Sequence, residues 1–237
     1  MPAPRRRRPG RPTPRPSPRR PAPRQVGTEL PREVVEDVRA AAGGKGNRAV
    51  SLLERAVAAL DGGRAVEAER AASEAKALAP RSGAVREVLG LALYRQGKFR
   101  EALRELQAYR RFTGRVDQNH LMADAHRALG SPDKAVNAAR EALDAEARLP
   151  AAVRSEAAVV GGAALADLGR YDEALALLRR FDHGPEVARP HDLRVWYVIA
   201  DVLERSGRPK EAARVFRRIL GHQPDAFDVP QRLARLS

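Results

Sequence analysis

The sequence predicts an all-α fold, an α-solenoid of about five antiparallel helix pairs with short N- and C-terminal capping helices. The main observation is a phrase that occurs five times, as ALDGGRAVEA, LYRQGKFREA, HRALGSPDKA, LADLGRYDEA and LERSGRPKEA. Its turn glycines, Gly63, Gly97, Gly130, Gly169 and Gly207, recur at similar intervals, and the last two intervals are slightly longer. A period of roughly 34 residues with two helical segments per unit is typical of solenoids, in which each helix pair buries its apolar face against the next.

The first element, residues 1–30, is predicted to be a disordered Pro/Arg-rich tail. Residues 1–24 hold nine arginines, nine prolines and no acidic residue. Proline lacks the N–H that helices and sheets need, and neighbouring arginines repel each other. The densest basic run is a candidate contact for a polyanion such as RNA or the ribosome. It consists of Arg5, Arg6, Arg7 and Arg8. Two other interpretations stay open: a solvating extension, or a translation start further downstream.

The next segment, residues 31–46, is predicted to be an N-terminal capping helix and loop. Pro31 suits a first helical turn, and Gly43-Gly44 suits a helix end. The residues predicted to share its apolar face are Val34, Val35, Val38 and Ala42. The loop GGKGN lacks the spacing of a phosphate-binding loop, so we predict no nucleotide site there.

Residues 47–225 are predicted to form the five repeats, each a helix, a glycine turn and a second helix. Close helix crossings require small side chains. These are Gly90, Ala123, Gly162 and Ala200 in the first helices, and Ala68, Ala102, Ala135, Ala174 and Ala212 in the second. We interpret Trp196 as a core residue between repeats. Residues 226–237 are predicted to form a C-terminal capping helix.

This pattern resembles the tetratricopeptide repeat (TPR). The fifth copy carries it most fully, with Trp196, Ile199, Ala200, Leu203, Gly207, Ala212, Phe216, Leu220 and Pro224 in register. The two longer intervals predict inserted loops near Arg148–Ser155 and His183–His191. The resemblance implies a protein-protein interaction adaptor or scaffold, which binds a partner peptide or protein in a concave groove lined by the first helices.

The repeat register places a set of residues in that groove. They are Glu87, Leu91, Tyr94, His120, Asp124, Asp167, Tyr197, Asp201 and Glu204, preceded by Val50 and Leu53 in the first repeat. Eight acids against four arginines at the groove positions predict an acidic surface for a basic peptide. The chain's own arginine-rich tail is one hypothetical ligand. The alternative is that these charges form only a solvated helix face.

Composition limits the remaining function classes. The net charge of +14 divides into +9 in residues 1–24 and +5 in the rest. This leaves an alternative function, an RNA- or ribosome-associated protein that contacts phosphate through the tail and basic helix surfaces. There is no cysteine and no catalytic constellation, so we expect no enzyme, metal or cofactor; His120 and Asp124 lack a third ligand. We also expect no membrane span and a cytoplasmic protein, with self-association possible.

Overall fold

The computed structural model describes residues 30–145, 149–184 and 188–236. Residues 1–29 of the predicted tail, including Arg5, Arg6, Arg7 and Arg8, lie outside this range. Within the described residues the regular elements are helices, which confirms the predicted all-α class.

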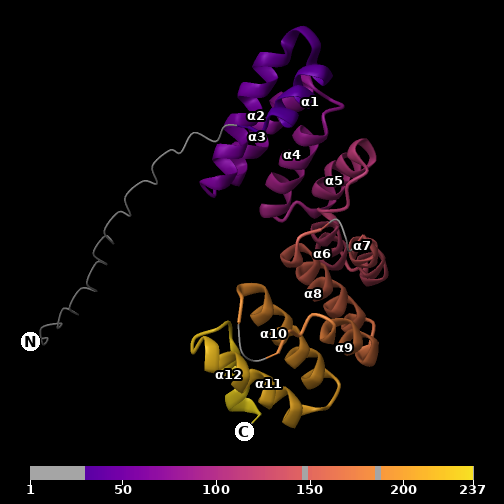
Figure 1. Ribbon diagram of the computed structural model, residues 1–237, viewed down its shortest axis with the longest axis vertical. Helices are drawn as coiled ribbons and strands as arrows, with labels where there is room; N and C mark the ends of the chain where they lie inside the picture. Colours follow the sequence, from indigo (N-terminus) through magenta and orange to yellow (C-terminus); the bar gives the residue numbers. More distant parts are fainter. Residues whose placement is uncertain (1–29, 146–148, 185–187, 237) are drawn as a thin grey trace, which may run out of the picture.

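Five antiparallel helix pairs form the solenoid in the described part of the chain (Figure 1). They are α2 (Gly46–Asp61) with α3 (Ala65–Leu78), α4 (Gly83–Arg95) with α5 (Phe99–Thr113), α6 (Asn119–Ala128) with α7 (Pro132–Asp144), α8 (Ala151–Asp167) with α9 (Tyr171–Arg179), and α10 (Pro190–Arg205) with α11 (Pro209–His222). Helix α1 (Arg32–Ala42) and the 3₁₀ turn Gly43–Lys45 precede them, and α12 (Val229–Arg235) follows.

The five turns between paired helices share one backbone conformation. Their glycines, Gly63, Gly97, Gly130, Gly169 and Gly207, have φ angles of 72°, 71°, 70°, 74° and 77°. This left-handed region is strained for residues with a Cβ atom, and glycine adopts it without that penalty. The repeated glycine in the sequence is therefore the residue that reverses the chain in every repeat.

Small residues let the paired helices cross closely, as predicted. A Cβ atom added to Gly90 would lie 2.7 Å from the Leu106 Cδ2 atom of the paired helix α5. The same addition to Gly162 would lie 2.7 Å from the Cγ atom of Leu178 in α9. Both contacts are shorter than van der Waals separations allow, so these two positions need glycine.

The fourth repeat starts earlier than its spacing suggested. The sequence predicts an inserted loop up to Ser155, but α8 begins at Ala151, and Ser155 is a buried helical residue. The segment AAVRSEAA consists mostly of good helix formers after Pro150, so it extends the helix and not the loop. The prediction of a loop is therefore wrong from Ala151 onward.

Two buried cores meet at α5. The first contains residues from Leu30 to Ala102, and the second begins with Leu103 and Leu106 and extends to Val229. Trp196 belongs to the second core and is fully buried, which confirms its predicted role. The division occurs inside one helix, so α5 contributes to both cores.

The flanking helices contact the first helices of the repeats. Helix α1 packs against α2 and α4, with Val38 fully buried. The Oδ2 atom of Asp37 in α1 accepts a hydrogen bond from the Oγ atom of Ser82, 2.5 Å away, at the start of α4. At the other end, α12 packs against α11 and directs Arg232 toward α10. The predicted capping helices thus also border the surface of the first helices.

Candidate functional site

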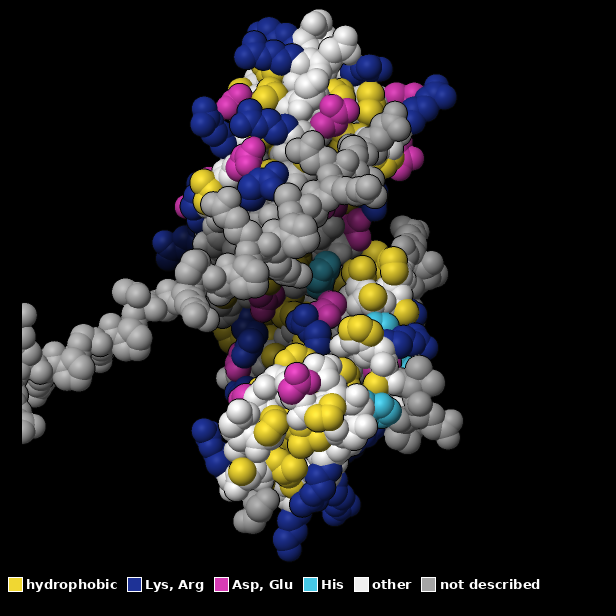
Figure 2. All heavy atoms as spheres, turned by 90° about the vertical axis from the view of Figure 1, so that its left-hand side faces the viewer, with side chains coloured by type: hydrophobic (Ala, Val, Ile, Leu, Met, Phe, Trp, Pro, Cys, Tyr) yellow, Lys and Arg dark blue, Asp and Glu magenta, His cyan; other side chains and the backbone are white. Residues whose placement is uncertain are grey.

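The first helices of the repeats, α2, α4, α6, α8 and α10, carry the residues predicted to line the groove. Figure 1 shows α6 and α8 on one side of the solenoid and α7 and α9 on the other. Figure 2 faces the first of these sides, where acidic, basic and histidine side chains gather in a recess at mid-height. We call the exposed residues of α4, α6, α8 and α10 on this side the groove row.

All nine predicted groove residues are at least partly exposed, and they lie on four helices. Glu87, Leu91 and Tyr94 come from α4, His120 and Asp124 from α6, Asp167 from α8, and Tyr197, Asp201 and Glu204 from α10. The first repeat differs. Leu53 is fully buried, and Val50 faces α1 across a cavity of ≈ 650 Å³ that Leu30 and Val35 also line.

Hydrogen bonds join α4 to the start of the third repeat. The Tyr94 hydroxyl donates to the Oδ2 atom of Asp124, and Glu87 Oε1 accepts from Gln118 Nε2 at 2.7 Å. Burial, together with the Asp124 carboxylate, raises the pKa of Tyr94. Burial also raises the pKa of Glu87, with the Asp117 charge adding to it and Gln118 opposing it. The shift at Tyr94 keeps its hydroxyl protonated as a donor to Asp124.

Asp167 of α8 joins three helices in the middle of the row. Its Oδ2 atom lies 2.5 Å from Arg127 Nε of α6, and its Oδ1 atom lies 3.1 Å from Arg205 Nη1 of α10. The Asp167 side chain is 28% exposed, so water screens these ion pairs only in part. The arrangement orients one carboxylate and two guanidinium groups along the row.

Arg232 of α12 closes the end of the row. Its Nη2 atom lies 2.9 Å from Asp201 Oδ1 and 2.7 Å from Glu204 Oε2. Its Nη1 atom donates to the Tyr197 hydroxyl oxygen at 3.2 Å, and that hydroxyl donates to Asp228 Oδ1 at 2.7 Å. Sequence reasoning missed Arg232 because it follows the last repeat, where the repeat register assigns no position.

The charges of this part of the row balance. Three carboxylates, Asp167, Asp201 and Glu204, contact three arginines, Arg127, Arg205 and Arg232. In the same way Glu156 of α8 contacts Arg194 of α10 at 3.0 Å. The carboxylates of Glu156, Asp167, Asp201 and Glu204 are therefore each paired with an arginine, and a basic ligand would compete with these arginines for them.

His120 is held as part of the fold of α6. Its Nδ1 atom lies 2.9 Å from the carbonyl oxygen of Asp117, and burial lowers the pKa of the imidazole, which favours the neutral ring. The described residues contain no group of three or more histidine, aspartate or glutamate side chains placed to hold a metal ion.

None of the helices in residues 30–145, 149–184 and 188–236 combines the length and apolar character needed to cross a bilayer.

Comparison with known proteins gives one consistent family. Three family models, each described as tetratricopeptide repeat, match residues 83–108, 120–186 and 165–236. No curated protein matches the sequence significantly.

Several solved structures share the fold at low identity. A tetratricopeptide repeat protein from Parabacteroides merdae has 21% identity and a TM-score of 0.64, over 80% of this chain and 72% of that one. YrrB, described as a TPR protein with an unusual peptide-binding site, has 16% identity and a TM-score of 0.60, over 83% and 97%. A thermophilic TPR protein of Thermus thermophilus has 19% identity and a TM-score of 0.59, over 79% and 98%.

Proposed function

Because the chain is a tetratricopeptide repeat protein, whose fold implies an interaction scaffold, we propose that it is a non-catalytic adaptor that binds a peptide or protein along the groove row. The peptide-binding site in the description of YrrB supports this class of activity. The proposal assigns the contact surface to α4, α6, α8 and α10.

The observation that carries the proposal is the set of bonds between successive first helices. Tyr94 to Asp124, Arg127 to Asp167 and Asp167 to Arg205 each cross from one repeat to the next. Side chains fixed before binding lose little conformational entropy when a partner docks. The row therefore offers a prearranged surface that extends over several repeats.

Two tyrosines are the expected anchors. Tyr94 and Tyr197 are partly exposed, and tyrosine is enriched at protein interfaces because it combines apolar area with a hydroxyl group. Leu91, one helical turn before Tyr94, adds a partly exposed apolar side chain. We expect a partner that presents apolar or guanidinium groups to these rings, with polar groups between them.

The test is affinity capture from a lysate of the source organism. Four proteins are compared: the full chain, residues 25–237, the groove variant Tyr94→Ala/Tyr197→Ala, and a control variant Phe112→Ala/Tyr171→Ala. The control also removes two aromatic rings, but from the second helices α5 and α9. Each capture is run with and without nuclease, after circular dichroism has established that the variants are folded.

One discrete protein supports the proposal if the full chain, residues 25–237 and the control capture it and the groove variant does not. If the groove variant captures the same protein as the full chain does, the contact surface lies outside the groove row. Capture of ribosomal proteins or RNA that disappears with nuclease or with residues 1–24 would replace the proposal by the RNA-associated alternative.

A further inference from the structure

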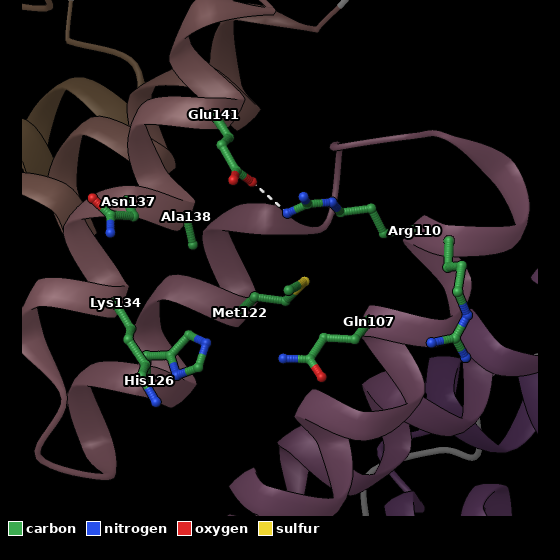
Figure 3. Close-up of a pocket in the computed structure, with 9 residues that line it drawn as sticks. Gln107, Arg110, Met122, His126, Lys134, Asn137, Ala138 and Glu141 are labelled. Carbon is green, nitrogen blue, oxygen red and sulfur yellow. Dashed lines mark hydrogen bonds and ion pairs between the residues drawn. The ribbon is translucent and has the colours of Figure 1, made fainter.

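A second recess lies between the second helices of the middle repeats. Residues of α5, α6 and α7 line a cavity of ≈ 470 Å³, and Figure 3 shows it closely. Met122 of α6 forms its floor and is 4% exposed, beside Ala138 of α7 at 7%. We call this recess the outer cleft. It shares none of its lining residues with the groove row.

The outer cleft is basic. Arg110 and Arg111 of α5 and Lys134 of α7 line it, against one carboxylate, Glu141. Arg110 forms an ion pair with Glu141 across the cleft. In the described part of the chain, Arg111 and Lys134 have no acidic partner, although both are exposed. The cleft thus keeps two cations available, whereas Arg127, Arg194 and Arg205 of the groove row are paired with carboxylates.

The cations are spread out. Figure 3 shows Lys134 and Arg110 on opposite sides of the opening, with Met122 between them. Gln107 and Asn137 add amide groups on the two walls. A single phosphate needs cations that converge on one point, whereas separated cations suit a ligand with several separated negative charges.

We propose that the outer cleft binds an acidic peptide segment of a partner protein. Its carboxylates would lie against Arg111 and Lys134, and an apolar side chain would cover Met122. A peptide fits better than a nucleic acid because a peptide can place an apolar side chain on the floor of the cleft between its carboxylates, whereas a phosphate backbone carries no such group. This surface is additional to the groove row and does not depend on it.

The pKa of His126 can be used to detect a ligand in the outer cleft. Its ring lies beside Lys134 in the lining (Figure 3), and burial lowers its pKa, with the Lys134 charge adding to the effect. A bound carboxylate favours the imidazolium form, so occupation of the cleft should raise the His126 pKa. Binding elsewhere on the molecule should leave that pKa unchanged.

The experiment uses the full chain and a fluorescein-labelled peptide of three Glu-Glu-Leu-Glu units as the probe. Fluorescence anisotropy gives its dissociation constant at 150 mM salt for the wild type, Arg111→Glu/Lys134→Glu and the control Lys210→Glu/Arg214→Glu. The control reverses two exposed cations of α11, so both variants have the same net charge. Proton NMR follows the His126 titration with and without unlabelled peptide.

We expect the cleft variant to weaken binding at least tenfold, the control to weaken it less than threefold, and the His126 pKa to rise on binding. Equal weakening by both variants, or an unchanged His126 titration, would overturn the proposal. An oligouridylate probe is run in parallel. Tighter binding of that RNA, lost in the same cleft variant, would replace the acidic peptide by a nucleic acid.

Discussion

The part of the solenoid from α1 to α4 and the part from α6 to α12 differ in the side chains that they bury. More than half of the buried residues in the first core are alanine, and none is aromatic. The second core contains Trp196, Phe216 and Phe181. Helices approach closely in both parts, at Gly90 and at Gly162, but a lost aromatic ring leaves a large cavity only in the second core. The two parts are therefore expected to differ most in their response to truncation of a buried side chain.

The largest expected effect is the loss of the tryptophan. Trp196 is fully buried, its Nε1–H donates to Asp182 at 3.0 Å, and the Arg218 guanidinium lies 3.6 Å from its ring centroid. We expect Trp196→Ala to lower the free energy of unfolding by about 3–5 kcal/mol. Ala72→Gly in the first core should lower it by about 1 kcal/mol. Urea unfolding followed by circular dichroism measures both; similar losses would remove the distinction between the two cores.

A buried carboxylate at the junction of α3, α4 and α5 gives the next largest effect. Glu105 of α5 accepts from Lys76 Nζ of α3 and Arg86 Nη1 of α4, each at 2.6 Å, and its side chain is 10% exposed. We expect Glu105→Gln to cost about 2–3 kcal/mol, because it leaves two cations without their shared partner.

The control for Glu105 is an exposed pair on α1. Glu36 accepts from Arg32 at 2.8 Å, and both side chains are mostly exposed. Glu36→Gln should cost less than about 0.5 kcal/mol. If the two glutamine variants unfold at the same urea concentration, Glu105 does not stabilise the junction of α3, α4 and α5.

An added methyl group tests close approach directly. Gly90→Ala places a Cβ atom 2.7 Å from Leu106, which is fully buried and has little room to move. We expect a net loss of about 1–2 kcal/mol, because the overlap exceeds the gain in helix propensity. Gly221→Ala, near the end of α11, meets nothing within 4 Å and should gain about 0.5–1 kcal/mol. Thermal unfolding should therefore shift in opposite directions.

The smallest effect is the contribution of Asp182, in the aromatic part, to the dependence of stability on pH. Burial raises the pKa of Asp182, but hydrogen bonds and charge from Arg218 outweigh it, so the pKa lies below the ordinary value. Such a carboxylate stabilises the fold above its unfolded pKa of about 3.9, and the contribution disappears as the pH falls through the lower folded value. Stability measured from pH 6 to pH 2 should decline less steeply in Asp182→Asn than in the wild type; parallel curves would exclude Asp182 as the cause.

Much of the fold could be predicted because the repeat encodes local geometry. Gly97 and its equivalents follow from one backbone conformation, and Gly90 and Gly162 follow from helix crossings inside a repeat. These requirements involve residues that are close in sequence or that recur at fixed positions of the repeat, so they can be recognised in one sequence.

For the charged residues of the groove row, the sequence predicted the positions on the helices but not the ion-pair partners. The register placed Asp167, Asp201 and Glu204 on the correct helices, but it did not pair them with arginines that come from other helices. Arg232 and helix α1 lie outside the repeats, where no pattern says which surface a helix will contact. Long arginine side chains can also reach several neighbouring carboxylates, so the spacing of residues in the sequence does not determine which carboxylate an arginine contacts.

The placement of α1 and Arg232 has a consequence for the size of a partner. Helix α1 packs on α2 and α4 at one end of the groove row, and Arg232 spans Tyr197, Asp201 and Glu204 at the other. A solenoid surface open at its ends could accept a polypeptide of any length and let it slide in register. If a partner binds along the groove row as proposed, the two boundaries would hold a segment of limited length in one position, and the row would select a ligand by its dimensions as well as by its chemistry.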